Sequence, residues 1–235
     1  MSDSIKVRKR NGRGIEPLNL EKMHKMVEEA TTGLAGVSAS QVEINSGIQF
    51  YDGITTDEIQ SILIRSASDL ITLDNPNYQF VAARLLLFGL RKNLYRRIRE
   101  MPPLIDHINK CVDNGVYDKE ILDNYTEEEL LTAEKFIDHD RDLLFTYAGL
   151  RQVVDKYLVQ DRSTGKVYES PQFMYIMIAL TIFAKYPQDK RLDYVRRYYD
   201  ATSRHKINIP TPIMAGVRTP IRQFASCVLV DADDT

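Results

Sequence analysis

Apolar side chains recur at helical spacing along most of this chain, whereas strand-like alternation is confined to short stretches. Residues 5–8 alternate apolar and basic positions, Asn11-Gly12 supplies a tight turn, and residues 14–18 return. This pattern predicts a β-hairpin. Helical patterns then begin near residues 20, 39, 56 and 77. The first hundred residues are therefore predicted to form a hairpin followed by four helices.

Local signals mark the predicted helix boundaries. Asn19 can cap the first helix, and the Thr-Thr-Asp-Glu sequence at residues 55–58 has the capping-box pattern that opens the third helix. The second helix is expected over residues 39–50, and the fourth is expected to run to residue 100. Met101-Pro102-Pro103 cannot continue a helix, which predicts a domain boundary at that point.

The second part of the chain is also predicted to be mainly helical. Helical patterns cover residues 104–114, 126–135, 139–157, 171–184 and 187–203, with a hairpin expected around residues 160–166. Residues 206–209 are β-rich, a Gly/Pro loop follows, and residues 223–230 have the pattern of a strand that carries Cys227. Such a strand needs neighbouring strands for its backbone groups. We therefore expect a mainly α chain whose last residues begin a larger catalytic unit.

Composition narrows the class of protein. The chain has 235 residues, a formal net charge of −2 and two cysteines, so neither a disulfide framework nor a zinc site is indicated, and a cytoplasmic setting is expected. No basic excess points to nucleic acid. The longest apolar run, residues 173–184, is shorter than the ~20 residues that span a bilayer, and the N-terminus does not resemble a secretory signal. We expect no nucleic-acid or membrane partner.

A candidate phosphate site lies at the predicted hairpin. Lys9 and Arg10 directly precede the Asn-Gly turn, and the hairpin leads into a helix N-terminus, where backbone N–H groups can bind anions. By itself this pattern is also typical of a solvated basic hairpin. The order of hairpin and four helices over residues 5–95 resembles the ATP-cone, a regulatory nucleotide-binding domain. The resemblance implies binding of ATP and dATP as allosteric effectors by Val7, Lys9, Arg10, Glu16, Asn19, Lys22, Thr56 and Lys92.

The resemblance also suggests roles within this set. The four cations, Lys9, Arg10, Lys22 and Lys92, would meet phosphate, and the smaller polar groups would orient the base and the sugar. Gln60 stands where some relatives of the ATP-cone have a histidine, so that one contact differs.

Cys227 is the second candidate. A single thiol on an apolar strand is by default a buried structural cysteine. Here, however, residues 210–220 (Pro-Thr-Pro-x-Met-x-Gly-x-Arg-Thr-Pro) precede Arg-Gln-Phe-x-Ser-Cys at residues 222–227. This sequence resembles the start of the ten-stranded barrel in the large subunit of class I ribonucleotide reductase, of the Ia type found in bacteria and their phages. The similarity covers nearly the whole chain.

The reductase resemblance implies further roles. Cys227 would be one half of a redox pair that reduces the ribose 2'-carbon of a ribonucleoside diphosphate, and Thr211 and Ser226 would bind the substrate. Asp234 and Thr235 resemble the beginning of the loop that binds the specificity effector. Implied partners are the rest of the large subunit, a radical-generating small subunit that carries the metal-radical cofactor, and a thioredoxin- or glutaredoxin-type reductant. A homo-oligomer of the large subunit is also implied.

We therefore expect an ATP-cone at residues 1–100, a helical part of the reductase catalytic domain at 101–205, and the first barrel strand or strands at 206–235. Further cysteines that the family needs are absent, which favours the hypothesis of a split enzyme that is inactive alone. The alternative is a regulator without enzymatic activity, in which an ATP-cone is joined to a helical interaction module.

Two charged clusters have simpler interpretations. The residues from Asp138 to Asp142 could suggest a metal site, but consecutive side chains at a helix start point in different directions, so salt bridges are favoured and no metal is expected. The basic run from Arg91 to Arg99 has only Tyr95 as an interleaved aromatic residue, and we assign it to the helix dipole rather than to nucleic acid.

Overall fold

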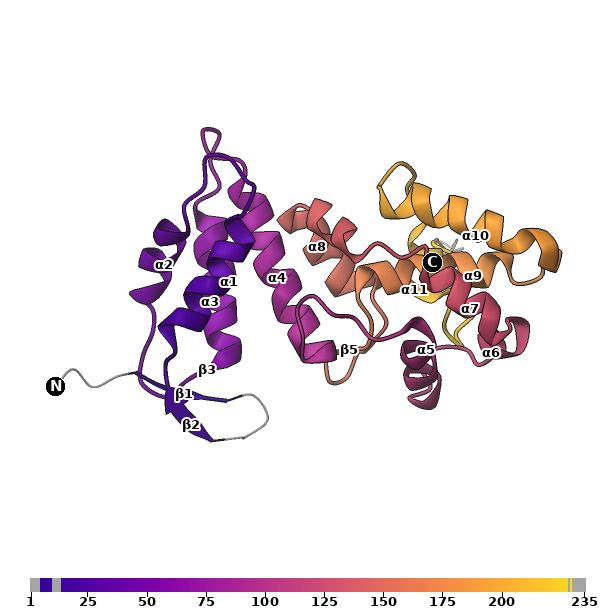
Figure 1. The fold of residues 1–235 in the computed structure, drawn as a ribbon, viewed down its shortest axis with the longest axis horizontal. Coiled ribbons are helices and arrows are strands. Elements are labelled where there is room, and N and C mark those ends of the chain that lie inside the picture. The colour runs from indigo at the N-terminus through magenta and orange to yellow at the C-terminus, as the bar shows by residue number, and fades with distance from the viewer. Residues whose placement is uncertain (1–4, 10–13, 228, 230–235) are drawn as a thin grey trace, which may run out of the picture. The chain divides into compact units, whose positions relative to one another are not determined.

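The computed structural model describes residues 5–9, 14–227 and 229 (Figure 1). The chain divides into two compact units. Unit 1 comprises Met1–Arg99 together with Leu143–Gln152, and unit 2 comprises Glu100–Asp142 together with Val153–Thr235. A short stretch from the middle of the chain thus packs with the N-terminal unit.

A small three-stranded sheet lies in unit 1. Its strands are β1 (Lys6–Arg8), β2 (Ile15–Pro17) and β3 (Ile54–Thr55), in the order β2-β1-β3. The pairing of β1 with β2 is antiparallel and confirms the predicted hairpin, while β3 pairs with β1 in parallel. The residues of the predicted Asn-Gly turn lie outside the described part of the chain. The sequence did not predict β3, which has only two residues.

Four predicted helices of unit 1 are confirmed. They are α1 (Leu20–Thr31), α2 (Ala39–Gly47), α3 (Thr56–Asp69) and α4 (Tyr78–Tyr95). α3 and α1 both pack against α4, and the short α8 (Tyr147–Gln152) packs there as well. α4 is shorter than predicted because Arg96 adopts a left-handed conformation, with φ 64°, that ends the helix. α2 likewise ends at Gly47 rather than residue 50.

The predicted caps form as expected. The Asn19 side chain accepts a hydrogen bond from the Lys22 backbone N–H at 2.8 Å. Thr55 and Glu58 form both bonds of a capping box at the start of α3. These carboxylate contacts hold the pKa of Glu58 below its usual value, mainly through the backbone N–H and hydroxyl of Thr55. Both helix starts are therefore fixed by contacts within three residues in sequence.

Unit 2 is built around α9 (Pro171–Phe183), whose residues from 171 to 180 are all buried. α10 (Gln188–Ser203) packs along it. The remaining elements are α5 (Leu104–Asp113), α6 (Glu120–Asn124), α7 (Glu127–Glu134), the π-helical turn η3 (Val153–Tyr157), β4 (Gln160–Asp161), β5 (Lys166–Val167) and α11 (Thr211–Gly216). β4 and β5 confirm the second predicted hairpin. No helix among the described residues is long and apolar enough to cross a membrane.

Three predictions for this region are wrong. The single helix expected over residues 139–157 is a 3-10 helix, η2 (His139–Leu144), followed by α8 and η3. Neither residues 206–209 nor the described residues of 223–230 form a strand, because the described part of the chain supplies no neighbouring strand to pair with them. The expected Gly/Pro loop contains α11 instead, which begins with a proline in its first turn, where the missing N–H costs nothing.

Candidate functional site

A cavity of about 500 Å³ in unit 1 gathers most of the predicted nucleotide contacts. It is bounded by the hairpin, by the first turns of α1 and α3, and by the last turn of α4. The predicted residues that line it are Val7, Lys9, Glu16, Asn19, Lys22, Thr56 and Lys92. Arg10 lies outside the described residues. Segments far apart in sequence thus bring seven of the eight predicted side chains to one place.

The sheet explains how the hairpin residues meet Thr56. Val7 is buried in the central strand, and the register places it opposite Glu16 on one side and Ile54 on the other. Because β3 leads directly into α3, pairing of β3 with β1 brings Thr56 beside the hairpin. The three segments are therefore held together by backbone hydrogen bonds rather than by the polar side chains of the site.

Two helix N-termini border the cavity. Asn19 precedes α1 and Thr56 is the first residue of α3. The N-terminus of a helix carries a partial positive charge and backbone N–H groups without helical partners, which favours anions. Part of this capacity is already used, since Asn19 and the Thr55–Glu58 capping box accept backbone N–H groups. The helix dipoles nevertheless add to the charge of the lysines.

Three lysines and Arg96, from different segments of the chain, supply the positive charge of the cavity. The Lys9 ammonium lies 2.5 Å from a carboxylate oxygen of Glu16, and both side chains are partly exposed. The Lys92 ammonium, on α4, lies 3.3 Å from the Met26 sulfur on α1.

The Thr56 hydroxyl is the least satisfied polar group of the cavity. Its Oγ1 atom is buried and has no hydrogen-bond partner among the described residues, unlike that of Thr55 next to it. A buried hydroxyl without a partner costs about 1–3 kcal/mol. Such a group at the wall of a cavity is suited to bind an atom that enters the cavity from outside.

Sequence reasoning missed the apolar wall of the cavity and Arg96. The additional lining residues are Pro17, Leu18, Met23, Met26, Ile59, Gln60 and Arg96. Gln60 is buried and donates to the Leu85 carbonyl at 2.8 Å. A Cβ at Gly89 would lie 3.0 Å from the Gln60 side chain, which would have to shift by a few tenths of an ångström to make room for it. Apolar spacing on α1 and α3 signalled burial but did not indicate which residues border a cavity.

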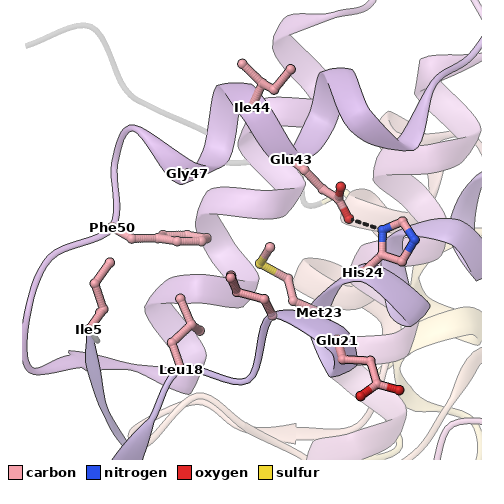
Figure 2. Close-up of a pocket in the computed structure, with 10 residues that line it drawn as sticks. Ile5, Leu18, Glu21, Met23, His24, Glu43, Ile44, Gly47 and Phe50 are labelled. Carbon is pink, nitrogen blue, oxygen red and sulfur yellow. Dashed lines mark hydrogen bonds and ion pairs between the residues drawn. The ribbon is translucent and has the colours of Figure 1, made fainter. Parts of the chain in front are cut away.

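A second cavity in unit 1, of about 790 Å³, has a different chemistry (Figure 2). Ile5, Leu18, Met23 and Phe50 line it together with Glu21, His24 and Glu43. His24 bonds Glu43 at 2.8 Å, and this contact is the main cause that raises the pKa of the imidazole. Because neither lysine nor arginine lines this cavity and two carboxylates do, it is poorly suited to a polyphosphate.

The predicted redox and substrate residues lie in unit 2. Cys227 is exposed, and its sulfur lies 3.8 Å from the Ser226 hydroxyl. The Thr211 hydroxyl, at the start of α11, lies 3.4 Å from the Tyr157 hydroxyl. The hydrogen bonds of the described residues do not join Thr211 to Ser226 or Cys227. Asp234 and Thr235 fall outside the described residues, so nothing is placed there.

The remaining candidates are structural. Cys111 is buried on α5, and burial raises the pKa of its thiol to about 12. Arg141 pairs with Asp138 and Asp200, as expected for a salt-bridged cluster. Among the described residues there is no group of three or more His, Cys, Asp and Glu side chains that could hold a metal ion.

A segment in each part of the chain matches a known protein family. Residues 5–93 match the ATP cone domain, and residues 143–222 match the all-alpha domain of ribonucleotide reductase. The first match contains every described residue of the cavity except Arg96. The ATP cone match indicates a domain that binds a nucleotide effector.

Curated relatives extend this similarity over the full length. The chain is 52% identical over 235 residues to ribonucleoside-diphosphate reductase 1 subunit alpha of Escherichia coli K12, and 52% identical over the same length to subunit alpha of Haemophilus influenzae. It is 45% identical over 213 residues, 90% of the chain, to subunit alpha of Enterobacteria phage T4. The chain spans 31% of the length of the first two relatives and 28% of the phage protein. On these matches, the chain is similar over its full length to the N-terminal region of ribonucleoside-diphosphate reductase alpha subunits and contains an ATP cone and an all-alpha reductase domain.

Proposed function

We propose that the 500 Å³ cavity binds ATP or dATP and that this binding regulates a ribonucleotide reductase. The observation that carries the proposal is the convergence of seven predicted side chains on one cavity with three lysines and two helix N-termini. A cavity of this size is within the range of small-ligand sites. The ATP cone match supports the nucleotide class.

The lysines and the other residues of the cavity have different proposed roles in nucleotide binding. Lys9, Lys22 and Lys92 bind the triphosphate, whose charge also benefits from the first turns of α1 and α3. Thr56 uses its unpartnered hydroxyl to bind the ligand. Val7 packs against the base, while Glu16 and Asn19 orient the base and the sugar. Arg10 belongs to the proposed phosphate contacts as well.

For the reductase part, the proposed substrates are ribonucleoside diphosphates and the proposed products are 2'-deoxyribonucleoside diphosphates. Thr211 and Ser226 bind the substrate, and Cys227 is one of two thiols that supply the reducing equivalents. The ribose 2'-hydroxyl leaves as water, a hydrogen takes its place, and the two thiols become a disulfide, so that atoms and electrons balance. A dithiol reductant of the thioredoxin or glutaredoxin class then restores the thiols.

The proposed complex contains further components. The second thiol and the remaining barrel come from the rest of the large subunit, and a small subunit generates the radical that starts the reaction. Asp234 and Thr235 are assigned to the start of a specificity-effector site. The all-alpha reductase match over residues 143–222 favours this assignment over the alternative of a stand-alone nucleotide-sensing regulator.

The first experiment is equilibrium binding of ATP, dATP and GTP to the purified chain. We expect saturable binding of both adenine nucleotides and at least about tenfold weaker binding of GTP, a difference of about 1.4 kcal/mol. Equal affinity for GTP would contradict adenine recognition. The second experiment adds the rest of the reductase, and we expect ATP to stimulate and dATP to suppress ribonucleoside-diphosphate reduction. A rate of reduction that neither ATP nor dATP changes would contradict the regulatory role.

A further inference from the structure

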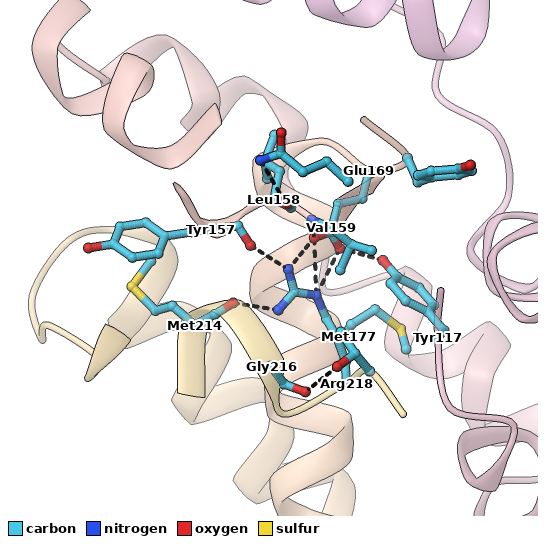
Figure 3. Close-up of polar contacts among 12 residues, drawn as sticks. Tyr117, Tyr157, Leu158, Val159, Glu169, Met177, Met214, Gly216 and Arg218 are labelled. Atoms are coloured by element: carbon cyan, nitrogen blue, oxygen red, sulfur yellow. Dashed lines mark hydrogen bonds and ion pairs between the residues drawn. The ribbon is translucent and has the colours of Figure 1, made fainter. Parts of the chain in front are cut away.

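A fully buried ion pair in unit 2 lies next to the proposed substrate residue Thr211. The Arg218 and Glu169 side chains are both completely buried. Figure 3 shows the polar contacts around Arg218. The Arg218 Nε atom donates to Glu169 at 2.9 Å, and Nη2 makes a second, very short contact with the same carboxylate. The pair is therefore bidentate, which fixes the plane of the guanidinium.

The guanidinium also bonds two carbonyls that belong to the surroundings of Thr211. Nη2 donates to the Tyr157 carbonyl at 2.9 Å, and Nη1 donates to the Met214 carbonyl at 2.5 Å. Tyr157 is the residue whose hydroxyl contacts the Thr211 hydroxyl, and Met214 lies within α11, the helix that Thr211 begins. The Arg218 side chain thus bonds the backbone of Tyr157 and the backbone of the helix that begins at Thr211.

The Glu169 carboxylate connects the ion pair to the rest of unit 2. Glu169 accepts hydrogen bonds from the Tyr117 hydroxyl at 2.5 Å and from the Val159 backbone N–H at 2.6 Å. In addition, the Asp118 backbone N–H donates to the Arg218 carbonyl at 3.0 Å. The pair connects the loop after α5, the end of η3, the hairpin and α11. Because the Arg218 and Glu169 side chains are completely buried, their effect on a ligand would be indirect.

We propose that Arg218 is a positioning residue that sets the distance between Tyr157 and Thr211, and so orients the Thr211 hydroxyl toward substrate. This inference rests on the proposed reductase function. Lysine could keep the charge of Arg218, but a single ammonium cannot hold the carboxylate and both carbonyls with the geometry of a planar fork. Charge alone is therefore insufficient for the role.

A matched control exists in the same unit. Arg191 forms another buried, bidentate pair, with Glu129, at 2.7 and 2.6 Å. Among the described residues, its polar and cation–π contacts are with Glu129 of α7, the Ala184 carbonyl and the Tyr125 ring, and they include neither Tyr157 nor Thr211. Arg191→Lys therefore measures the general cost of replacing a buried arginine in unit 2, without the effect on Thr211.

The test compares Arg218→Lys, Arg191→Lys and Tyr157→Phe in the assembled reductase. We expect Arg218→Lys to raise the KM for ribonucleoside diphosphate at least about tenfold more than Arg191→Lys does, with unchanged ATP binding at unit 1. Tyr157→Phe removes the hydroxyl contact while leaving the Arg218 bonds to backbone, and should raise KM without lowering Tm. Equal KM changes for the two arginine variants, or an unchanged KM for Tyr157→Phe, would overturn the proposal.

A second measurement does not depend on turnover. Hydrogen exchange in the chain itself should be faster within α11 in Arg218→Lys than in Arg191→Lys. Uniform acceleration throughout unit 2 in both variants would overturn the positioning role even if Arg218→Lys is too unstable for the assay. Absence of turnover by the unsubstituted reductase would contradict the proposed function instead, and the exchange result would still decide the role of Arg218.

Discussion

The Lys9 ammonium and the Glu16 carboxylate form an ion pair of 2.5 Å at the wall of the cavity that we assign to the nucleotide. A phosphate that binds Lys9 competes with this carboxylate. We therefore expect Glu16→Gln to strengthen the phosphate contribution to binding by up to about fivefold, the scale of a partly exposed ion pair. The measurement is the ratio of adenosine to ATP dissociation constants, which separates phosphate binding from base binding. A ratio that falls in Glu16→Gln would contradict the competition.

We expect the Thr56 hydroxyl to contribute to ATP binding and not to the stability of the fold. Thr56→Val removes a buried hydroxyl that has no partner, so the free energy of unfolding should stay equal or increase. ATP affinity should fall about fivefold, as expected for one lost hydrogen bond. Both quantities are measurable by thermal melting and calorimetry. An ATP affinity that is unchanged in Thr56→Val would contradict the assignment of Thr56 to the nucleotide site.

The neighbouring Thr55 is the matched control for this substitution. Thr55→Val breaks the capping box with Glu58 and should destabilise the chain by about 1 kcal/mol. The two adjacent threonines are therefore predicted to change stability in different directions. Equal destabilisation by both substitutions would mean that the Thr56 hydroxyl has a structural partner.

The two thiols should differ strongly in reactivity. Cys227 is exposed, whereas Cys111 is buried with its pKa raised to about 12, chiefly by burial. Because the thiolate is the reactive form, a disulfide reagent should label one thiol per native chain quickly and the second only on unfolding. Cys227→Ser should remove the fast phase and should abolish turnover of the assembled reductase. Fast labelling in Cys227→Ser would contradict the burial of Cys111.

Stability should depend on pH through His107. Its ring is buried and stacked on Phe173 at 4.0 Å, and burial lowers its pKa from 6.5 to about 3. Between these values the unfolded chain binds the proton and the folded chain does not. Acidification from about pH 6.5 toward 3 should therefore cost about 1.4 kcal/mol of stability per pH unit from this group.

Chemical denaturation at several pH values measures this dependence. His107→Gln should reduce the slope of stability against pH by the contribution of one proton across the same window. Carboxylates with lowered pKa values, such as Glu129, add their own slope at lower pH in both proteins and cancel in the difference. An identical slope for His107→Gln would mean that His107 is protonated in the folded chain.

Local signals in the sequence determined which features could be predicted. The Asn19 cap and the capping box at Thr55 depend on residues three apart, and both form. The Pro212 signal for α11 was present but was interpreted as a loop. The helix expected over residues 139–157 failed because its continuous apolar spacing did not reveal the change to 3-10 and π geometry.

Long-range relationships could not be predicted in the same way. The Arg218–Glu169 pair joins residues 49 positions apart, and neither residue carries a local signal of its partner. The expected strand at residues 223–230 depends on strands that the described residues do not supply. By contrast, the family resemblance, rather than spacing alone, related Lys92 to the hairpin, and residues of both line the cavity.

The most direct test of the account is calorimetric titration of ATP into the chain and into two lysine variants. Lys9→Ala removes a cation of the cavity, whereas Lys25→Ala removes an exposed lysine of α1 that pairs with Glu21 and does not line the cavity. We predict that Lys9→Ala weakens ATP and dATP binding at least about tenfold, on the scale of one charge-assisted contact, and that Lys25→Ala leaves both unchanged. ATP binding that is the same in Lys9→Ala as in the unsubstituted chain would contradict the assignment of this cavity as the effector site.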